Sequence, residues 1–252
     1  MATDDHIRRN RDRWNATAGE WIAAAERNWA AEEPRWGEWG VAESELQMLP
    51  EDMTGMDAVD LGCGTGYVSS WMARRGARVR AIDLSAEQLA TARRLQALHG
   101  TAIDFVEGDA ERLPWEDESA DFAISEYGAV TWCEPEAWLR EAHRVLRPGG
   151  RLVFLGAHPL LDICWPLDGS VPAVETFQQS YFDLSRQDWS EEGVDFNLPL
   201  ETWFALFRDI GFEVEDYREP RASANGPNWG DMITRDWAHR FPSEQVFTLR
   251  KR

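Results

Sequence analysis

The chain has 252 residues, with 45 acidic and 26 basic side chains, a formal net charge of -19 and a pI near 4.6. This balance disfavours nucleic acids and anionic membranes as partners, because both are negatively charged and are bound through clustered Lys and Arg. The three cysteines lack C-x-x-C spacing, the N-terminus is polar, and no apolar run approaches the roughly 20 residues of a membrane span. We therefore expect a cytoplasmic protein with no disulfide framework and no metal site.

The first elements predicted along the chain are helical. Apolar residues between 5 and 30 recur at spacings of three, four and seven, so Trp14, Ala18 and Trp21 share one helix face. Pro34 ends or interrupts this pattern. The segment either packs over a ligand pocket or forms an amphipathic helix at the edge of a sheet.

A strand predicted at 56–61 runs into a glycine-rich loop and then a helix over 66–75. Its alternate glycines are Gly62, Gly64 and Gly66. Glycine lacks a Cβ, so a ligand can lie against the main chain there, close to the free N–H groups of the next helix. A dinucleotide-binding loop would place glycine at Tyr67, and Asp60 would repel a pyrophosphate. The loop instead suits a cationic or ammonium-bearing ligand.

The second strand, predicted at 77–82, ends at Asp83. This carboxylate lies roughly 20 residues beyond the glycine loop, where it can accept both ribose hydroxyls of an adenosine. The alternative role, capping the following helix, suits Ser85 better, with Gln88 completing a capping box. We therefore favour the ribose role.

The remaining strands complete an α/β pattern. Strands are predicted at 102–106, 121–125, 151–156, 211–217 and 245–249, and helices at 135–146 and 200–210. Glu126 and Tyr127 follow the strand at 121–125, at the strand ends where an open parallel sheet forms its ligand crevice. The segment 157–199 has four prolines, lacks a regular pattern and is rich in aromatic residues, so it is predicted to be functional rather than disordered.

Four ordered segments, VDLGCGTG, IDLS, GDA and LRPGG, occur between residues 14 and 160. Together they resemble the class I, Rossmann-like methyltransferases of small molecules that depend on S-adenosylmethionine (SAM). The resemblance implies a seven-stranded, mostly parallel sheet with helices on both faces and one antiparallel strand. It also implies SAM as the cofactor and S-adenosylhomocysteine (SAH) as the product, with LRPGG as a structural corner.

By this resemblance the glycine loop and Asp60 hold the methionine end of the cofactor, Asp83 the ribose, and Asp109 with Ala110 the adenine. Trp14, Ala18 and Trp21 match a helix that packs over the cofactor in related enzymes. The full set of expected cofactor-binding residues is Asp60, Gly62, Cys63, Gly64, Gly66, Asp83, Leu84, Gln88, Asp109, Ala110, Ser125, Glu126 and Trp21.

The sequence defines less well which residues bind the molecule that accepts the methyl group. Methyl transfer from a sulfonium needs mainly orientation and a dry cavity, and a base is optional. The candidate catalytic residues are His158, Tyr127 and Glu126, with Tyr181 weaker. The 14 tryptophans either fill the core or line a pocket for a flat or apolar acceptor.

We thus expect a single methyltransferase domain over 1–252, acting on a small organic molecule as a monomer or homodimer. It divides into an N-terminal helical cap at 1–50, a SAM-binding core at 51–156, a lid or substrate insertion at 157–199, and a C-terminal part at 200–252. Two alternatives remain. One is an NAD-dependent oxidoreductase, and the other is a SAM-binding protein without catalytic function.

Overall fold

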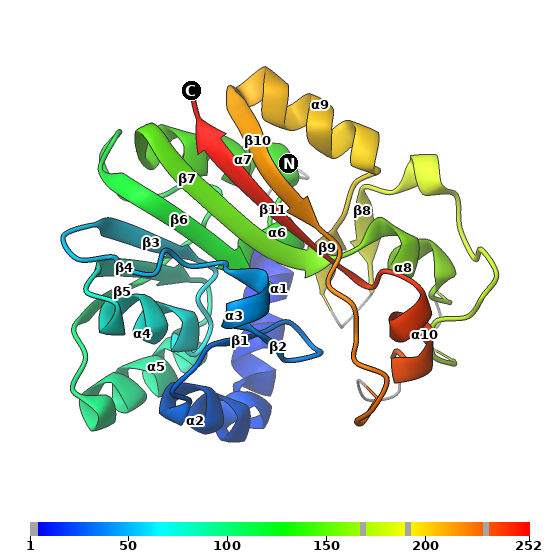
Figure 1. Ribbon diagram of the computed structural model, residues 1–252, viewed down its shortest axis with the longest axis horizontal. Helices are drawn as coiled ribbons and strands as arrows, with labels where there is room; N and C mark the ends of the chain where they lie inside the picture. Colours follow the sequence, from blue (N-terminus) through cyan, green and yellow to red (C-terminus); the bar gives the residue numbers. More distant parts are fainter. Residues whose placement is uncertain (1–4, 167–169, 190–192, 229–231) are drawn as a thin grey trace.

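The structure, a computed structural model, describes residues 5–166, 170–189, 193–228 and 232–252 (Figure 1). Its centre is a seven-stranded sheet in the order β10-β11-β7-β6-β3-β4-β5. The five strands from β7 to β5 pair in parallel, and β11 runs antiparallel to both β7 and β10. This confirms the predicted mostly parallel sheet with one antiparallel strand.

The elements follow the predicted order. The sheet strands are β3 (Asp57–Leu61), β4 (Arg78–Asp83), β5 (Ile103–Glu107), β6 (Ala120–Glu126), β7 (Leu146–Ala157), β10 (Phe212–Arg218) and β11 (Glu244–Lys251). The helices that pack on the sheet are α4 (Tyr67–Arg74), α5 (Ala86–His99), α6 (Ala129–Trp132), α7 (Pro135–Val145) and α9 (Leu200–Ile210). Strand β7 begins earlier than predicted because Leu146 already pairs with Ala120.

Successive residues of β3 face opposite sides of the sheet, as strand geometry requires. Ala58 joins a core under α4 and α5, whereas Val59 and Leu61 join a second core under α7 and α9. Figure 1 shows these two helix pairs on opposite faces of the sheet. Because helices cover both faces of the sheet, the ligand crevice is confined to the ends of the parallel strands.

The N-terminal region is less regular than the continuous pattern over 5–30 predicted. It divides into α1 (Asp5–Thr17), a 3-10 turn η1 (Ala18–Trp21) and α2 (Ile22–Ala30). The chain then forms β1 (Arg35–Trp36), β2 (Val41–Ala42) and α3 (Glu43–Leu46). We call residues 35–42, which carry the β1–β2 pair, the strap. The Trp29 indole N–H donates to the Thr65 carbonyl at 2.9 Å, which fixes α2 on the glycine loop.

The segment predicted as a lid contains regular elements. It holds α8 (Pro159–Cys164), η2 (Tyr181–Asp183), β8 (Arg186–Asp188) and β9 (Val194–Phe196), while its residues 167–169 and 190–192 lie outside the described part. A further helix, α10 (Arg235–Arg240), precedes β11. Among the described residues, no helix is long and apolar enough to cross a membrane.

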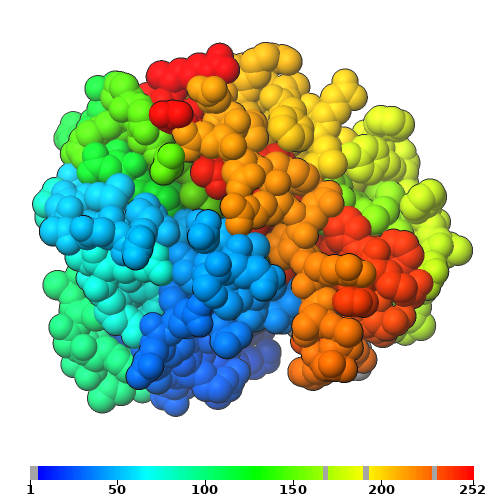
Figure 2. Space-filling view, in the orientation of Figure 1, coloured from blue at the N-terminus to red at the C-terminus, as the bar shows by residue number. Residues whose placement is uncertain are grey.

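The N-terminal and C-terminal parts of the chain contact one another on two sides of the molecule. Figure 2 shows the orange segment after β10 lying against the light-blue segment around α3, where the Arg218 guanidinium donates to the Leu46 carbonyl at 3.1 Å. Elsewhere, Asn10 of α1 is fully buried. Its amide donates to the carbonyls of Trp132 and Val194 at 3.0 and 2.7 Å and accepts from the Val194 N–H at 2.7 Å. The N-terminal helix is thereby bonded to β9.

We predict that Asn10→Ala lowers the free energy of unfolding by about 2–4 kcal/mol, because it leaves three buried backbone groups without partners. Urea denaturation followed by circular dichroism measures this change, and a single shared transition is expected. Arg11→Ala, on the exposed face of the same helix, is the control and should change stability by less than about 0.5 kcal/mol. Equal stability of the two variants would contradict the assignment.

Candidate functional site

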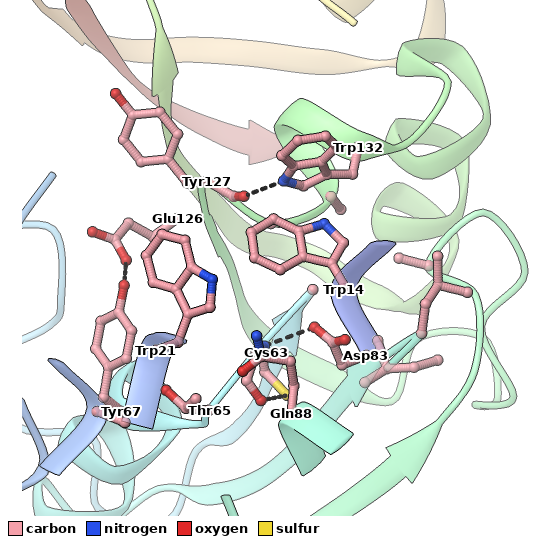
Figure 3. A pocket seen from close by; sticks show the side chains of 18 of the residues that line it. Trp14, Trp21, Cys63, Thr65, Tyr67, Asp83, Gln88, Glu126, Tyr127 and Trp132 are labelled. Carbon is pink, nitrogen blue, oxygen red and sulfur yellow. Dashed lines mark hydrogen bonds between the residues drawn. The ribbon is translucent and has the colours of Figure 1, made fainter. Parts of the chain in front are cut away.

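One cavity of about 350 Å³ opens at the carboxyl ends of β3, β4 and β6. Its walls come from the glycine loop, the end of β4, the turn after β6, α1, α2 and the strap. Segments that precede β3 in the chain and segments that follow it therefore enclose the same cavity. Figure 3 shows the side chains that point into it.

The glycine loop touches the turn after β6 backbone to backbone. Gly62 has φ +77°, and a Cβ there would fall 2.6 Å from the Ala129 nitrogen. A Cβ on Gly128 would fall 2.3 Å from the Gly62 carbonyl oxygen. Neither position accommodates a side chain, so the two glycines allow the ends of β3 and β6 to meet. The contact places Glu126 and Tyr127 beside the loop.

Asp83 holds this loop from the end of β4. Its two carboxylate oxygens accept the N–H groups of Gly64 at 2.7 Å and Ser85 at 2.8 Å. Ser85 caps α5 by accepting the Gln88 N–H at 3.1 Å, as predicted. The Gln88 side chain does not complete the capping box. Its Oε1 is buried and has no hydrogen-bond partner among the described residues, and the residue lines the cavity, so it offers an acceptor to a ligand.

Glu126, at the end of β6, joins three segments at the opposite end of the cavity. One carboxylate oxygen accepts the Gly37 N–H of the strap at 2.9 Å, and the other accepts the Tyr67 hydroxyl. Tyr67 directly follows the last loop glycine, Gly66. The carboxylate therefore connects the strap, the first turn of α4 and the sheet.

Glu244, the first residue of β11, fixes the strap from behind. Its Oε1 accepts the Glu38 N–H at 2.7 Å and the Tyr127 hydroxyl at 2.9 Å, whereas its Oε2 is buried without a partner. Gly37 has φ +65°, and a Cβ there would lie 2.3 Å from Glu244 Oε1. A side chain at position 37 would require Glu244 to move and would be strained at this positive φ, so both features favour glycine.

This concentration of buried acids shifts their protonation. Burial, and then the neighbouring Glu244 and Glu126, raises the pKa of Glu38 to about 8. Burial raises the pKa of Glu244 to about 7 and that of Glu126 above its ordinary range. The pKa values of Tyr67 and Tyr127 lie well above 10 because both rings are buried beside these carboxyl groups. Both tyrosines are therefore neutral hydrogen-bond donors.

Indole rings form another wall. Trp14 of α1 contacts Trp21 with ring centroids 5.6 Å apart and Trp132 of α6 at 5.2 Å. The Trp132 indole N–H donates to the Tyr127 carbonyl at 3.0 Å, which supports the left-handed turn at Tyr127, φ 49°. Figure 3 shows Trp14 between the Glu126 end and the Asp83 end of the cavity. These tryptophans face the cavity, whereas Trp29, Trp36, Trp138 and Trp203 are buried in the cores.

Most predicted site residues share this cavity. Those that line it are Trp21, Gly62, Cys63, Gly64, Asp83, Leu84, Gln88, Ala110, Glu126 and Tyr127. Four others lie behind the wall. Asp60 is buried against the Ser69 hydroxyl at 2.6 Å, Gly66 lies against Phe105, the Ser125 hydroxyl donates to the Leu61 carbonyl, and Asp109 accepts the Glu111 N–H. These four support the walls and do not line the cavity.

His158, a predicted catalytic candidate, also lies outside the cavity. Its Nδ1 accepts the Leu160 N–H at 3.0 Å as the cap of α8, and its Nε2 lies 3.3 Å from Glu219. Burial lowers its pKa, so the ring is neutral at pH 7. None of the described residues of 157–199, Tyr181 included, lines the cavity. Among the described residues, the segments that wall the cavity outside the sheet ends include α1, η1, α2 and the strap, and the lid role of 157–199 stays a prediction.

One group of side chains in the described residues has the spacing of metal ligands. Atoms of Asp109, Glu111 and Cys133 lie within 4.8 Å of one another. Burial raises the pKa of the Cys133 thiol well above 9, and Glu111 already contacts His6 at 2.6 Å and accepts the Glu134 N–H at 2.7 Å. In this structure Glu111 Oε1 is engaged by His6 and by the Glu134 N–H, and the Asp109 carboxylate accepts the Glu111 N–H.

Sequence reasoning missed several residues of the cavity. Tyr67 was considered only as a position where glycine is absent, although it lies in the first turn after the loop. Glu38 and Gly37 lie in W-G-E-W, which matches no motif that we recognised. The two flanking tryptophans are the one signal that could have indicated a structured strap.

Comparison with known proteins agrees with this geometry. Residues 59–154 match the family model described as a methyltransferase domain. The chain is 37% identical over 172 residues to the malonyl-[acyl-carrier protein] O-methyltransferase of Pectobacterium atrosepticum, a match that covers 66% of this chain and 63% of that protein. The matched stretch thus spans less than two thirds of this relative.

Solved structures share the fold. A SAM-dependent methyltransferase from Mesorhizobium loti superimposes with a TM-score of 0.68 at 27% identity, covering 85% of this chain and all of that one, 100%. The [4+2]-cyclase SpnF has a TM-score of 0.66 at 21% identity and covers 96% of this chain and 95% of its own. The similarity to SpnF concerns the fold alone.

The raised pKa of Glu244 leads to a prediction on pH and stability. The folded chain binds this proton more tightly than the unfolded chain, whose carboxyl has a pKa near 4.5. The resulting stability is complete below about pH 4.5 and is lost as the pH rises through about 7. Glu244→Gln keeps an Oε1 acceptor but does not titrate, so its stability should fall less between pH 5 and pH 8, by up to about 1.4 kcal/mol per pH unit.

Urea denaturation at several pH values measures this slope. The matched control is Glu213→Gln, an exposed residue on β10, which should follow the wild type. An unchanged slope in Glu244→Gln would show that Glu244 titrates normally in the folded protein.

Proposed function

The chain belongs to the Rossmann-like methyltransferases that depend on SAM, and we propose that it transfers a methyl group from SAM to a small organic acceptor. The observation that carries this proposal is the shared cavity. It joins the glycine loop and Asp83 at one end to an aromatic, carboxyl-lined space at the other. One end suits an adenosine and the other suits an acceptor.

The residues present fit the cofactor. Gly62 and Gly64 offer bare backbone, with φ of +77° and +51°. Each oxygen of Asp83 accepts one backbone N–H and keeps a second lone pair for a ribose hydroxyl. Gln88 adds a buried acceptor oxygen without a partner. We propose that Asp83 and Gln88 bind the ribose, that Gly108 and Ala110 flank the adenine, and that the glycine loop meets the methionine part.

Bound SAM supplies an activated methyl group on a positively charged sulfur. The protein's contribution is to orient the acceptor and exclude water. Trp14, Trp21 and Trp132 form an apolar wall that lies between the two ends of the cavity. Glu126 faces the acceptor as a fixed negative group, because Gly37 and Tyr67 hold its two oxygens in position at the cavity wall. Tyr127 remains a donor that can orient the acceptor.

Two alternatives bear on this proposal. A dinucleotide oxidoreductase is disfavoured because the position after the third glycine holds Tyr67, bonded to Glu126, and because the cavity is acidic. The likeness to a [4+2]-cyclase shows that this fold also occurs in a protein named for other chemistry. Methyl transfer is favoured here because the curated relative is itself named as a methyltransferase.

We predict that Asp83→Ala lowers the affinity for SAH by roughly 100-fold, since two hydrogen bonds to a charged acceptor are lost and the glycine loop loses its support. Titration calorimetry with SAH measures this change, and circular dichroism checks that the variant is folded. The control is Asp104→Ala, an exposed carboxylate on the neighbouring strand β5, which should bind like the wild type.

A parallel titration with NADH separates the cofactor classes. Binding of SAH alone supports the proposal, and unchanged SAH affinity in Asp83→Ala would refute the ribose assignment. Binding of NADH alone would favour the oxidoreductase. If SAH binds, but no methyl group is transferred from SAM to the acceptors that are tested, the protein binds the cofactor without catalysis.

A further inference from the structure

The end of the cavity away from Asp83 is walled by carboxyl groups and aromatic rings. Figure 3 shows Tyr67, Glu126 and Trp21 together on one side, with Asp83 and Gln88 on the other. Glu38 lines the same cavity. Among all the side chains that line it, Arg27 is the one positive charge, and it is exposed on α2. The acceptor end is therefore negative or neutral, and its walls are aromatic.

Three glutamates meet there, but they are not equally engaged. Glu126 accepts two hydrogen bonds, and Glu244 accepts two through its Oε1. Within the described part of the chain, the carboxyl group of Glu38 has no hydrogen bond or ion pair. Glu38 and Glu126 are half-buried and Glu244 is buried, and placing carboxyl groups together partly away from water without a counter-charge is unfavourable. A ligand that brings a positive charge to Glu38 would remove this cost.

The aromatic rings favour the same kind of ligand. Trp21, Tyr67 and Tyr127 line the cavity beside the glutamates. The face of an aromatic ring attracts a cation, and rings around a cavity are a recurrent way to hold an ammonium group. The hydroxyls of both tyrosines are already directed to Glu126 and Glu244, so their polar ends are satisfied. The rings of Trp21 and Tyr67 line the cavity on the Glu126 side.

Resting on the proposed methyl transfer, we propose that the acceptor carries an amine and that its nitrogen binds between Glu38 and Glu126, against the rings of Trp21, Tyr67 and Tyr127. This differs from what the name of the malonyl-carrier relative describes. A carboxylate acceptor at this end would face two glutamates, and among the described lining residues the exposed Arg27 is the one positive side chain that it could pair with. An ammonium group would instead complete the charge balance.

The same glutamates also provide an acceptor for the proton that N-methylation releases. An ammonium nitrogen must lose one proton before its lone pair can attack the methyl carbon. An ammonium group beside Glu38 favours the charged form of this carboxyl group, and the resulting carboxylate, which lines the cavity, can accept that proton. The nitrogen's lone pair then forms the N–C bond, the electrons of the C–S bond stay on sulfur, and the proton remains on the glutamate. The atoms and charges balance without a further reactant.

A matched pair of probes tests the proposal. Phenethylamine and hydrocinnamate share a phenyl ring and a short linker, and differ in carrying an ammonium or a carboxylate group. Titration calorimetry of the whole protein, with and without saturating SAH, should show phenethylamine binding at least about tenfold more tightly. At about pH 7, binding should also release protons, because the cation favours the charged form of Glu38. Buffers of different ionisation enthalpy measure this release.

Glu38→Gln should weaken phenethylamine by about tenfold, abolish most of the proton release, and leave SAH affinity within about twofold. Its matched control is Glu32→Gln, an exposed residue just before the strap, which should behave as the wild type. Preference for hydrocinnamate, or unchanged amine binding and proton release in Glu38→Gln, would overturn the proposal. Failure of SAH to bind would instead contradict the methyltransferase function, and the titration without SAH would still decide the amine preference.

Discussion

The site depends on the contact between two glycines. Gly62 and Gly128 let the backbone after β3 touch the backbone after β6, at a separation that any Cβ would prevent. Since β3 and β6 are neighbours in the sheet, this contact sets how close the glycine loop lies to Glu126 and Tyr127. The two ends of the cavity are therefore positioned relative to each other by main-chain packing, which is stiffer than contacts between flexible side chains.

Around this glycine contact, carboxyl groups hold the neighbouring loops and the strap in place by accepting hydrogen bonds. Asp83 holds the glycine loop, Glu126 and Glu244 hold the strap, and Glu43 accepts the Trp36 indole N–H at 2.6 Å and pairs with Arg75 at 3.0 Å. Acids serve here because loops expose many N–H donors and a carboxylate can accept several at once. The strongly acidic composition thus has a structural use inside the molecule as well as on its surface.

The sheet and the cofactor end of the site could be predicted from sequence because their determinants are local. The loop around Gly62 and the position of Asp83 follow from short spacings between a strand and a helix. At the other end of the cavity Glu126 and Tyr127 were predicted from their place after a strand, whereas Glu38 and Glu244 were not, because these glutamates are brought to Glu126 and Tyr127 from distant segments. His158 was misleading for a related reason, since its place just after a strand does not reveal that its ring caps α8. Composition alone did not separate the tryptophans of the core from those of the cavity.

The burial of Asn10 has a consequence for engineering. Its bonds to Val194 join the N-terminal helix, which carries Trp14 of the cavity wall, to the insertion after β7. A chimaera that exchanged only residues 157–199 with a homologous chain would set foreign backbone against that amide and shift the helix above the cavity. New acceptor preferences are therefore better sought by point changes in the strap, or by exchanging α1 and the insertion as a pair.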